Sequence, residues 1–343
     1  MQPDILTQAK LFEHCYNRLL CYLSEELGVE DTLLIPSSTF SEAIAELSTI
    51  RDFIRFTVTC LRAADVHIGH GSEDPFAEAS ALVMQSLSLQ WSADPEILEA
   101  KLLRSEKQAI VDLLEKRVNQ RIPLGYLLNL AYFCGYPFYV DERVLIPRSP
   151  IAELINNRFV DYIEQEPQRI LDLCTGSGCI AIALAYAFPD AVVDGTDISL
   201  DALSVAAVNV DHHNLLENVN LIESDLFNKL PNQRYDLIVS NPPYVDAQDM
   251  ADLPNEYQKE PELALAAGAD GLDIVRQILA QAANHLTEDG LLVVEVGNSE
   301  WALAQEFPEV PFTWIEFEKG GSGVFALTAE QCRDYQKMFQ EAL

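Results

Sequence analysis

Apolar runs that alternate with helical patterns after residue 150 constrain the fold of this 343-residue chain more than any other feature. A helix is expected over 151–165, and strands and helices then follow in turn. The predicted strands are 169–174, 191–197, 220–223, 236–240, 291–296, 312–318 and 323–328, and the later helices are 179–188, 200–213, 272–286 and one from 298. Such alternation is typical of a doubly wound sheet with helices on both faces. We therefore predict a Rossmann-like, seven-stranded α/β domain.

The first 120 or so residues carry helical periodicity and almost no strand pattern. The leucines at 11, 19, 20, 23 and 27 form an amphipathic stripe that ends at Gly28. Ser38 or Thr39 could cap one long helix that closes near Gly69, and further patterns cover 75–89 and a stretch opened by Ser105. These segments predict a small helical bundle.

Aromatic and β-branched runs join the two regions. The runs 132–140 and 143–146 are separated by Asp141 and Glu142 and end at a P-R-S-P sequence, which indicates a β-hairpin. We predict a helical substrate-recognition domain at 1–128, a hairpin linker at 129–150 and a third domain at 151–343. Because the hairpin bridges the two domains, we expect that it could line an active site.

The formal net charge is −32. A field of this sign repels phosphate backbones, which disfavours direct nucleic-acid binding, and it attracts a basic partner. The alternative is that the acid excess only keeps the protein soluble.

The seven cysteines are scattered and form no C-x-x-C pair, which favours reduced thiols over a disulfide framework or a zinc site. His67 and His70 could form a metal pair, but surface histidines at a helix end are the more common case, so no metal is expected. The first ten residues lack a signal pattern, and the apolar stretch 180–188 is about half of a membrane span. We predict a cytoplasmic protein with no membrane contact.

The sequence S-N-P-P-Y-V at 240–245 follows the apolar run 235–239. Two prolines cannot continue a strand, so the chain must leave the sheet at its carboxyl end, where open α/β sheets bind ligands. Asn241 offers a carboxamide, Pro242 a backbone carbonyl freed from the sheet, and Tyr244 a flat ring. Two acceptors and a stacking ring suit a planar N–H₂ group, which favours a reaction at an amide or amino nitrogen.

The segment 171–180, L-D-L-C-T-G-S-G-C-I, reads as a strand, a glycine-bearing turn and a helix start. Gly176 and Gly178 allow a tight turn and close approach of a ligand to the backbone. Taken alone, the loop also fits a dinucleotide fingerprint. Asp197 ends the next strand, where its carboxylate could bond a ribose diol, a feature that dinucleotide enzymes share.

Two acidic residues favour a different ligand. Asp172 stands in the turn, with its carboxylate expected to face the ligand, where it would oppose a pyrophosphate but could attract a sulfonium or ammonium group. Asp225 follows the third strand and could accept from an adenine amino group, with Leu226 packed on the base. A plain helix cap or turn is the alternative for Asp225.

These motifs resemble the class I S-adenosylmethionine-dependent methyltransferases that modify glutamine amides. The resemblance rests on D-L-C-T-G-S-G at 172–178, T-D-I-S at 196–199 and N-P-P-Y-V at 241–245, and it covers about residues 40–330. One subfamily modifies peptide-chain release factors and another the third protein of the large ribosomal subunit. The hairpin 133–150, D-L-P-N-E-Y at 252–257 and F-E-K-G-G-S-G-V-F at 317–325 are similar to the second subfamily.

The resemblance implies S-adenosylmethionine as cofactor and assigns roles to individual residues. Its expected contacts are Asp172, Cys174, Thr175, Gly176, Gly178, Asp197, Ile198, Asp225, Leu226 and Asn241. Catalysis is assigned to Asn241, Pro242 and Tyr244, and substrate binding to these three with Pro243 and Arg148. Arg148 could instead pair with a carboxylate. The loop 260–271 is expected beside the site or as a plain connector.

The implied partner is a basic ribosomal protein, met before or early in ribosome assembly. Three alternatives remain open. The first is a release-factor glutamine methyltransferase, with the same chemistry on another protein. The second is an adenine amino methyltransferase on nucleic acid, which the charge disfavours. The third is a Rossmann-like binding module that treats N-P-P-Y as a plain turn.

Overall fold

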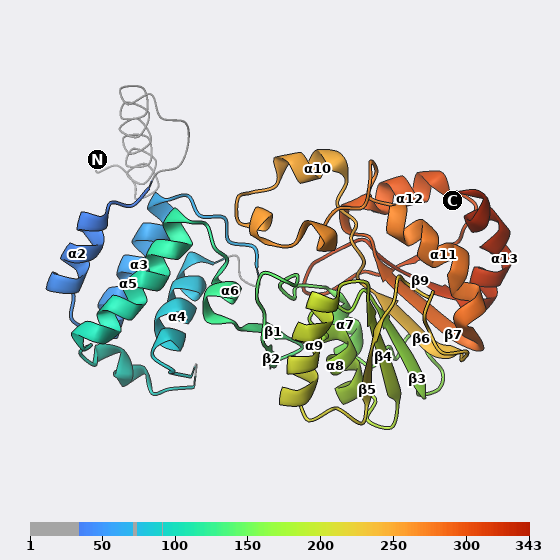
Figure 1. The fold of residues 1–343 in the computed structure, drawn as a ribbon, viewed down its shortest axis with the longest axis horizontal. Helices are drawn as coiled ribbons and strands as arrows, with labels where there is room; N and C mark the ends of the chain where they lie inside the picture. Colours follow the sequence, from blue (N-terminus) through green and yellow to red (C-terminus); the bar gives the residue numbers. More distant parts are fainter. Residues whose placement is uncertain (1–33, 71–73, 91) are drawn as a thin grey trace, which may run out of the picture.

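The computed structural model describes residues 34–70, 74–90 and 92–343 (Figure 1). The predicted leucine stripe at 11–27 lies outside these residues. Among the helices that they form, none combines the length and apolar content that crossing a lipid bilayer requires. The helical region lies on one side of the molecule and the sheet on the other (Figure 1).

The helical region packs its elements around one apolar core. Its elements are α2 (Ser37–Glu46), α3 (Ile50–Ala63), α4 (Pro75–Ser86), η1 (Pro95–Glu99), α5 (Arg104–Asn119) and α6 (Leu124–Leu128). Phe53, Leu82, Ile110 and Leu114 are fully buried in that core. The predicted bundle is therefore present, with its apolar stripes turned inward.

The single long helix expected to close near Gly69 is wrong, because α2 and α3 are separate. Thr49 has an extended backbone and caps α3: its hydroxyl accepts from the Asp52 amide at 3.1 Å, and Asp52 accepts from the Thr49 amide at 2.8 Å. This reciprocal cap satisfies backbone donors that would otherwise lack partners, so the chain starts a new helix here.

The hairpin is present, but its predicted turn at 141–142 is wrong. β1 (Ala131–Phe133) pairs antiparallel with β2 (Tyr136–Phe138). Cys134 and Gly135 form the turn with φ of 50° and 83°, the left-handed conformations that suit a two-residue hairpin. Residues 143–146 form no strand; Asp141 instead accepts from the Arg143 amide and guanidinium in a local turn.

The predicted seven-stranded sheet is confirmed, in the order β5-β4-β3-β6-β7-β9-β8. The strands are β3 (Arg169–Leu173), β4 (Val192–Asp197), β5 (Val219–Glu223), β6 (Tyr235–Ser240), β7 (Leu286–Glu295), β8 (Thr313–Trp314) and β9 (Val324–Thr328). Strands β3 to β7 pair in parallel, whereas β9 is antiparallel to both β7 and β8.

Helices cover both faces of the sheet. They are α7 (Ile151–Asn156), α8 (Cys179–Ala187), α9 (Leu200–His212), α10 (Ala247–Asp252), α11 (Asp273–His285), α12 (Glu300–Glu306) and α13 (Ala329–Glu341), with the short turns η2 (Tyr257–Lys259), η3 (Glu262–Ala264) and η4 (Gly297–Ser299). Helices α10 and α13 were not predicted. Helix α7 stops well before residue 165, because Arg158 and Phe159 adopt positive φ.

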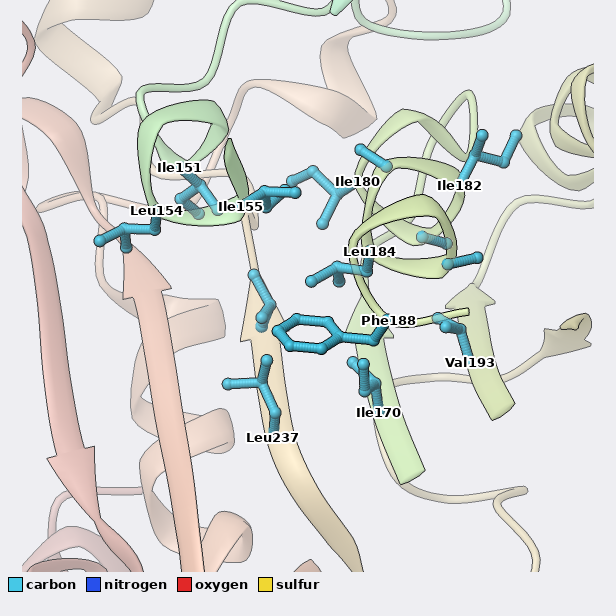
Figure 2. Packing of buried hydrophobic residues seen from close by; sticks show 14 of the residues in the cluster. Ile151, Leu154, Ile155, Ile170, Ile180, Ile182, Leu184, Phe188, Val193 and Leu237 are labelled. Atoms are coloured by element: carbon cyan, nitrogen blue, oxygen red, sulfur yellow. The ribbon is translucent and has the colours of Figure 1, made fainter. Parts of the chain in front are cut away.

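The main core fills the space between the sheet and its helices. Figure 2 shows the Phe188 ring, which follows α8, lying beside Ile170 of β3 and Leu237 of β6, with Leu184 of α8 above it. A second cluster packs α11 and α13 on the other face. Because both faces are buried, the ligand-accessible edge of the parallel strands is their carboxyl end.

Candidate active site

A cleft opens where β3, β4, β5 and β6 end. Most residues predicted for the site line it: Arg148, Cys174, Thr175, Gly176, Asp197, Ile198, Asp225, Leu226, Asn241 and Pro243. They come from segments far apart in the sequence, and the parallel register brings them to one edge. The structure thus assembles these residues at the edge where the sequence places them.

The turn after β3 forms an open cradle. A Cβ atom built on Gly176 would meet no atom within 4 Å, so the backbone here faces free space, and φ is 54°. The Gly176 amide donates to Asp197 Oδ2 at 2.9 Å, which ties the turn to the end of β4. Gly178, with φ of 79°, is instead the N-cap of α8 and lies against Ala206, so its role is in the turn itself.

Asp172 does not face the cleft as expected. Its side chain is fully buried behind the turn, where Oδ2 accepts from the Thr175 hydroxyl at 2.5 Å and from the Ala181 amide at 3.0 Å. Oδ1 is buried without a hydrogen-bond partner among the described residues. Backbone N–H groups that point into the protein need acceptors. The Asp172 carboxylate accepts one of them and thereby stabilises the turn from its buried side. Burial raises its pKa to about 7.

Replacing Asp172 by asparagine is expected to give a pH-dependent change in stability. A carboxyl with a raised folded-state pKa binds protons more tightly when folded, so wild-type stability falls as pH rises from about 4 to about 7 and is level above. The stability of the variant relative to the wild type should therefore increase as pH rises from about 4 to about 7. Thermal unfolding of both proteins from pH 4 to 8 measures this, and a constant difference in Tm would contradict it.

Asp197 and Asp225 provide the acidic part of the cleft wall. Asp197 Oδ1 accepts from the Ser199 amide at 2.9 Å, and burial raises the pKa of this carboxyl. Asp225 accepts from Asn228 Nδ2 at 3.2 Å through Oδ2, while Leu226, with φ of 46°, turns the chain back beside it. Both carboxylates can accept from hydroxyl or amino groups of a ligand.

The segment after β6 presents a free carboxamide. Ser240, the last residue of β6, donates through Oγ to the Leu173 carbonyl at 2.9 Å, which fixes the point of departure from the sheet. Asn241 lines the cleft, and in the described part of the chain no hydrogen bond engages its side chain. Pro242 is buried, and Pro243 lies in the cleft wall. A polar group left without a partner at a ligand edge is available to a ligand.

Tyr244 is held away from the cleft wall, which differs from the expected stacking position. Its hydroxyl donates to Glu295 Oε1 at 2.9 Å, and Glu295 Oε2 accepts from the Ser149 hydroxyl at 2.5 Å. The ring lies against Gly297, where an added Cβ would come within 2.5 Å of it. Burial raises the pKa of Glu295 to about 6. Because a buried carboxyl that loses a hydrogen bond costs free energy, the hydrogen bond from Tyr244 holds the phenol in place.

Arg148 is engaged by a buried carboxylate rather than free. Its Nη1 and Nη2 donate to Glu260 Oε1 and Oε2 at 2.6 and 2.7 Å, and the Ile146 amide donates to the same carboxylate at 3.0 Å. The guanidinium also lies 5.0 Å from the Tyr257 ring centroid. The alternative considered for Arg148, pairing with a carboxylate, is therefore found.

Glu256 fastens the loop after α10 to the helical region. Its Oε1 accepts from the His67 amide at 3.1 Å and from Arg121 Nη1 at 3.3 Å, and Arg117 Nη1 lies 3.5 Å away. All three partners belong to the helical side, and Figure 1 shows this loop lying next to it. The docking role of Glu256 was not predicted.

His67 and His70 pack on Tyr257, with ring centroids 5.3 and 4.5 Å from the tyrosine ring. His70 is largely buried, whereas His67 is exposed, as expected for a surface histidine. Within 34–70, 74–90 and 92–343, no three His, Cys, Asp or Glu side chains gather as a metal ion would require.

The segment after Glu260 forms another wall of the cleft, as one of the two alternatives predicted. Pro261, Leu263, Ala264 and Ala266 line it. Val245 pairs with this segment: its amide donates to the Leu265 carbonyl at 2.8 Å, and its carbonyl accepts from the Ala267 amide at 2.9 Å. The lining residues Val144, Leu145, Pro147 and Ser149 were not singled out from the sequence.

Known proteins are similar to this chain over most of its length. The model of the methyltransferase small domain matches residues 156–257. A Francisella tularensis subsp. tularensis protein named ribosomal protein uL3 glutamine methyltransferase is 47% identical over 302 residues, 88% of this chain and 96% of that protein. A Neisseria meningitidis serogroup A protein of the same name is 48% identical over 294 residues, 85% of this chain and 97% of that protein.

Solved structures show weaker likeness. The catalytic domain of hMettl16 in complex with MAT2A 3′UTR hairpin 1 is 20% identical, with a TM-score of 0.44 over 67% of this chain and 83% of that chain. A likeness of this size carries no conclusion about activity.

Proposed function

This chain belongs to the family of ribosomal protein uL3 glutamine methyltransferases, and from that membership we propose how its cleft performs the reaction. The enzyme transfers a methyl group from S-adenosylmethionine to the side-chain amide nitrogen of a glutamine in ribosomal protein uL3, on a class I methyltransferase fold. The observation that carries the residue-level proposal is the unengaged carboxamide of Asn241 at the cleft edge.

The cofactor fits the carboxyl edge of β3 to β5. The open cradle at Gly176 leaves room for a ligand against the backbone, and Asp197 and Asp225 offer acceptors to the hydroxyls of a ribose and the amino group of an adenine. Ile198 and Leu226 supply apolar walls. Cys174 and Thr175 complete the turn, whereas Asp172 and Gly178 act by shaping it.

The substrate amide is assigned to Asn241 and Pro242. When bound, S-adenosylmethionine supplies an electrophilic methyl group on a sulfonium. An amide nitrogen is a weak nucleophile because its lone pair is delocalised into the carbonyl. Asn241 Oδ1 and the Pro242 carbonyl would each accept one N–H of the substrate amide, which polarises the nitrogen and fixes its direction. Pro243 and Leu263 in the wall help to exclude water. The proton becomes acidic only as the methyl arrives, so no strong base is needed beforehand.

Tyr244 and Arg148 act through position. The hydrogen bond to Glu295 fixes the Tyr244 backbone, and with it the prolines that precede it. Arg148 contributes to the substrate side through the wall that it builds with Glu260, since Glu260 occupies both of its terminal nitrogens.

Replacing Tyr244 by phenylalanine is expected to lower the free energy of unfolding by about 1–3 kcal/mol, because the buried Glu295 loses one of its two hydrogen bonds. The aromatic packing on Gly297 stays, so kcat should fall only a few-fold. Denaturant unfolding and steady-state kinetics measure the two quantities. A drop in kcat as large as that of an Asn241 variant, with unchanged stability, would assign the hydroxyl a direct chemical role.

The charge of the chain favours a substrate protein that is not yet packed against assembled rRNA. With a net charge of −32, the enzyme attracts a basic protein and is repelled by packed rRNA. We propose free uL3 or an early assembly particle as the substrate in the cytoplasm, with no direct nucleic-acid binding.

Methyl transfer from labelled S-adenosylmethionine tests the proposal. Purified uL3, a class 1 release factor and the assembled large subunit are offered in parallel. Label on free uL3 alone is expected. Label on the release factor alone would overturn the substrate, and equal label on the assembled subunit would overturn the timing.

A further inference from the structure

A second cavity lies on the helical side of the cleft. Helices α4 and α6 and strand β1 form most of its wall. Its lining residues are His70, Ala77, Glu78, Ala81, Gln85, Arg117, Leu124, Gly125, Leu128, Leu130, Ala131, Tyr132, Ile146 and Pro147. Most of these are small or apolar, so the cavity suits a side chain with an apolar body.

The wall between this cavity and the cofactor cleft is thin. Pro147 lines both. Beside it, Arg148 faces the cleft, His70 faces the cavity, and Glu260 stands between them. Glu260 Oε2 lies 2.7 Å from Arg148 Nη2 and 3.5 Å from His70 Nε2. One layer of side chains therefore separates the site of methyl transfer from the second cavity.

The charged groups of the cavity are already neutralised. Glu78 accepts from Arg117 Nε at 2.6 Å, with both side chains buried. Glu260 is held by Arg148. A charged side chain entering the cavity would therefore find no free counter-charge and would lose its hydration.

Two side chains in the cavity wall have buried nitrogens without a hydrogen-bond partner among the described residues: both ring nitrogens of His70, and Nη1 of the Arg117 guanidinium, which is otherwise paired. The His70 side chain is 5% exposed. A buried polar atom of this kind costs free energy unless a ligand supplies the missing bond. Together these features select an uncharged side chain that can hydrogen-bond to an imidazole.

We propose that this cavity binds an uncharged side chain of uL3 two residues from the modified glutamine. The proposal rests on the function proposed above. In an extended peptide, side chains two residues apart leave on the same side and are spaced by about 7 Å. That spacing allows one segment to place the glutamine in the cleft and its neighbour beyond the Pro147 wall. The cavity thereby sets which glutamine is modified.

Ala81→Leu tests the proposal by filling the cavity. Ala81 is partly exposed on α4, where leucine is a good helix former, so the variant should fold. The KM for uL3 is expected to rise tenfold or more, with kcat and the affinity for S-adenosylhomocysteine within twofold of wild type. Ala109→Leu, on the exposed face of α5, is the matched control and should leave all three unchanged.

A second part of the experiment uses substituted uL3 as the substrate. Lysine is placed singly two residues before and two residues after the modified glutamine. One of the two variants should raise the KM of the wild-type enzyme tenfold or more, and in the Ala81→Leu enzyme the same change should add little further. An unchanged KM for Ala81→Leu, or fully additive effects, would overturn the cavity assignment. A wild-type enzyme inactive on uL3 would overturn the proposed function itself, so the two failures are distinct.

Discussion

Asn241→Ala is expected to lower kcat by about 10²–10³-fold, the size of effect seen when one positioned polar group is removed from a reacting centre. The carboxamide is the only side-chain acceptor that N-P-P-Y brings to the cleft edge, and no hydrogen bond within the described residues competes for it. The fold should tolerate the change, because the side chain makes no hydrogen bond to the described part of the chain.

The measurement is single-turnover methylation of uL3 beside calorimetric binding of S-adenosylhomocysteine. Affinity for the cofactor product should change by only a few-fold. Asn232→Ala is the control, since Asn232 is exposed in the loop before β6, at the opposite end of that strand. A kcat that survives within a few-fold would show that Asn241 does not hold the substrate amide.

Glu260→Ala is expected to lower the free energy of unfolding by about 3–5 kcal/mol. The change leaves Arg148 without its carboxylate and removes the acceptor of the Ile146 amide. Because Glu260 also adjoins the cleft segment that starts at Pro261, kcat for uL3 should fall even where the variant is fully folded. Glu262→Ala, two residues further on and exposed, should do neither.

The effect of Glu260 has a definite pH dependence. Burial acts to raise its pKa, but the nearby His70 ring and the hydrogen bonds from Arg148 together hold the pKa below its usual value of 4.5. A depressed carboxyl pKa stabilises the fold above 4.5, and this contribution is lost as pH falls through the lowered value. Urea unfolding of wild type and Glu260→Gln at pH 4 and pH 7 should therefore show the larger difference at pH 7. The same difference in the free energy of unfolding at both pH values would show that the ion pair with Arg148 does not cause it.

The sheet was predictable from sequence because its strands are buried on both faces and read as continuous apolar runs, such as Leu237–Val239. The hairpin turn was misplaced because acidic residues at 141–142 gave the stronger turn signal, whereas the true turn depends on Cys134 in a conformation that cysteine rarely adopts. Helix α13 was missed because its residues are polar on average, which obscures the apolar stripe formed by Cys332, Tyr335 and Phe339.

The cofactor edge was predictable for a topological reason: the carboxyl ends of parallel strands converge, so residues after each strand must meet. The contacts of Glu256 and Glu260 were not, because their partners are remote in sequence. His67 lies 189 residues from Glu256, and Arg148 lies 112 residues from Glu260. No local pattern encodes which of many carboxylates is buried, and the same limit explains the mistaken orientation of Asp172.

Glu256 joins the helical region to the loop that follows α10, so the contact between the two regions depends on segments that lie far apart in the sequence. A chimera that carried the helical region of a related enzyme on this sheet would change the partners of Glu256, which lie 189 and 135 residues before it in the sequence. Such a graft would leave buried carboxylates facing foreign side chains. An exchange of the helical region between relatives therefore requires residues 253–262 to be exchanged with it.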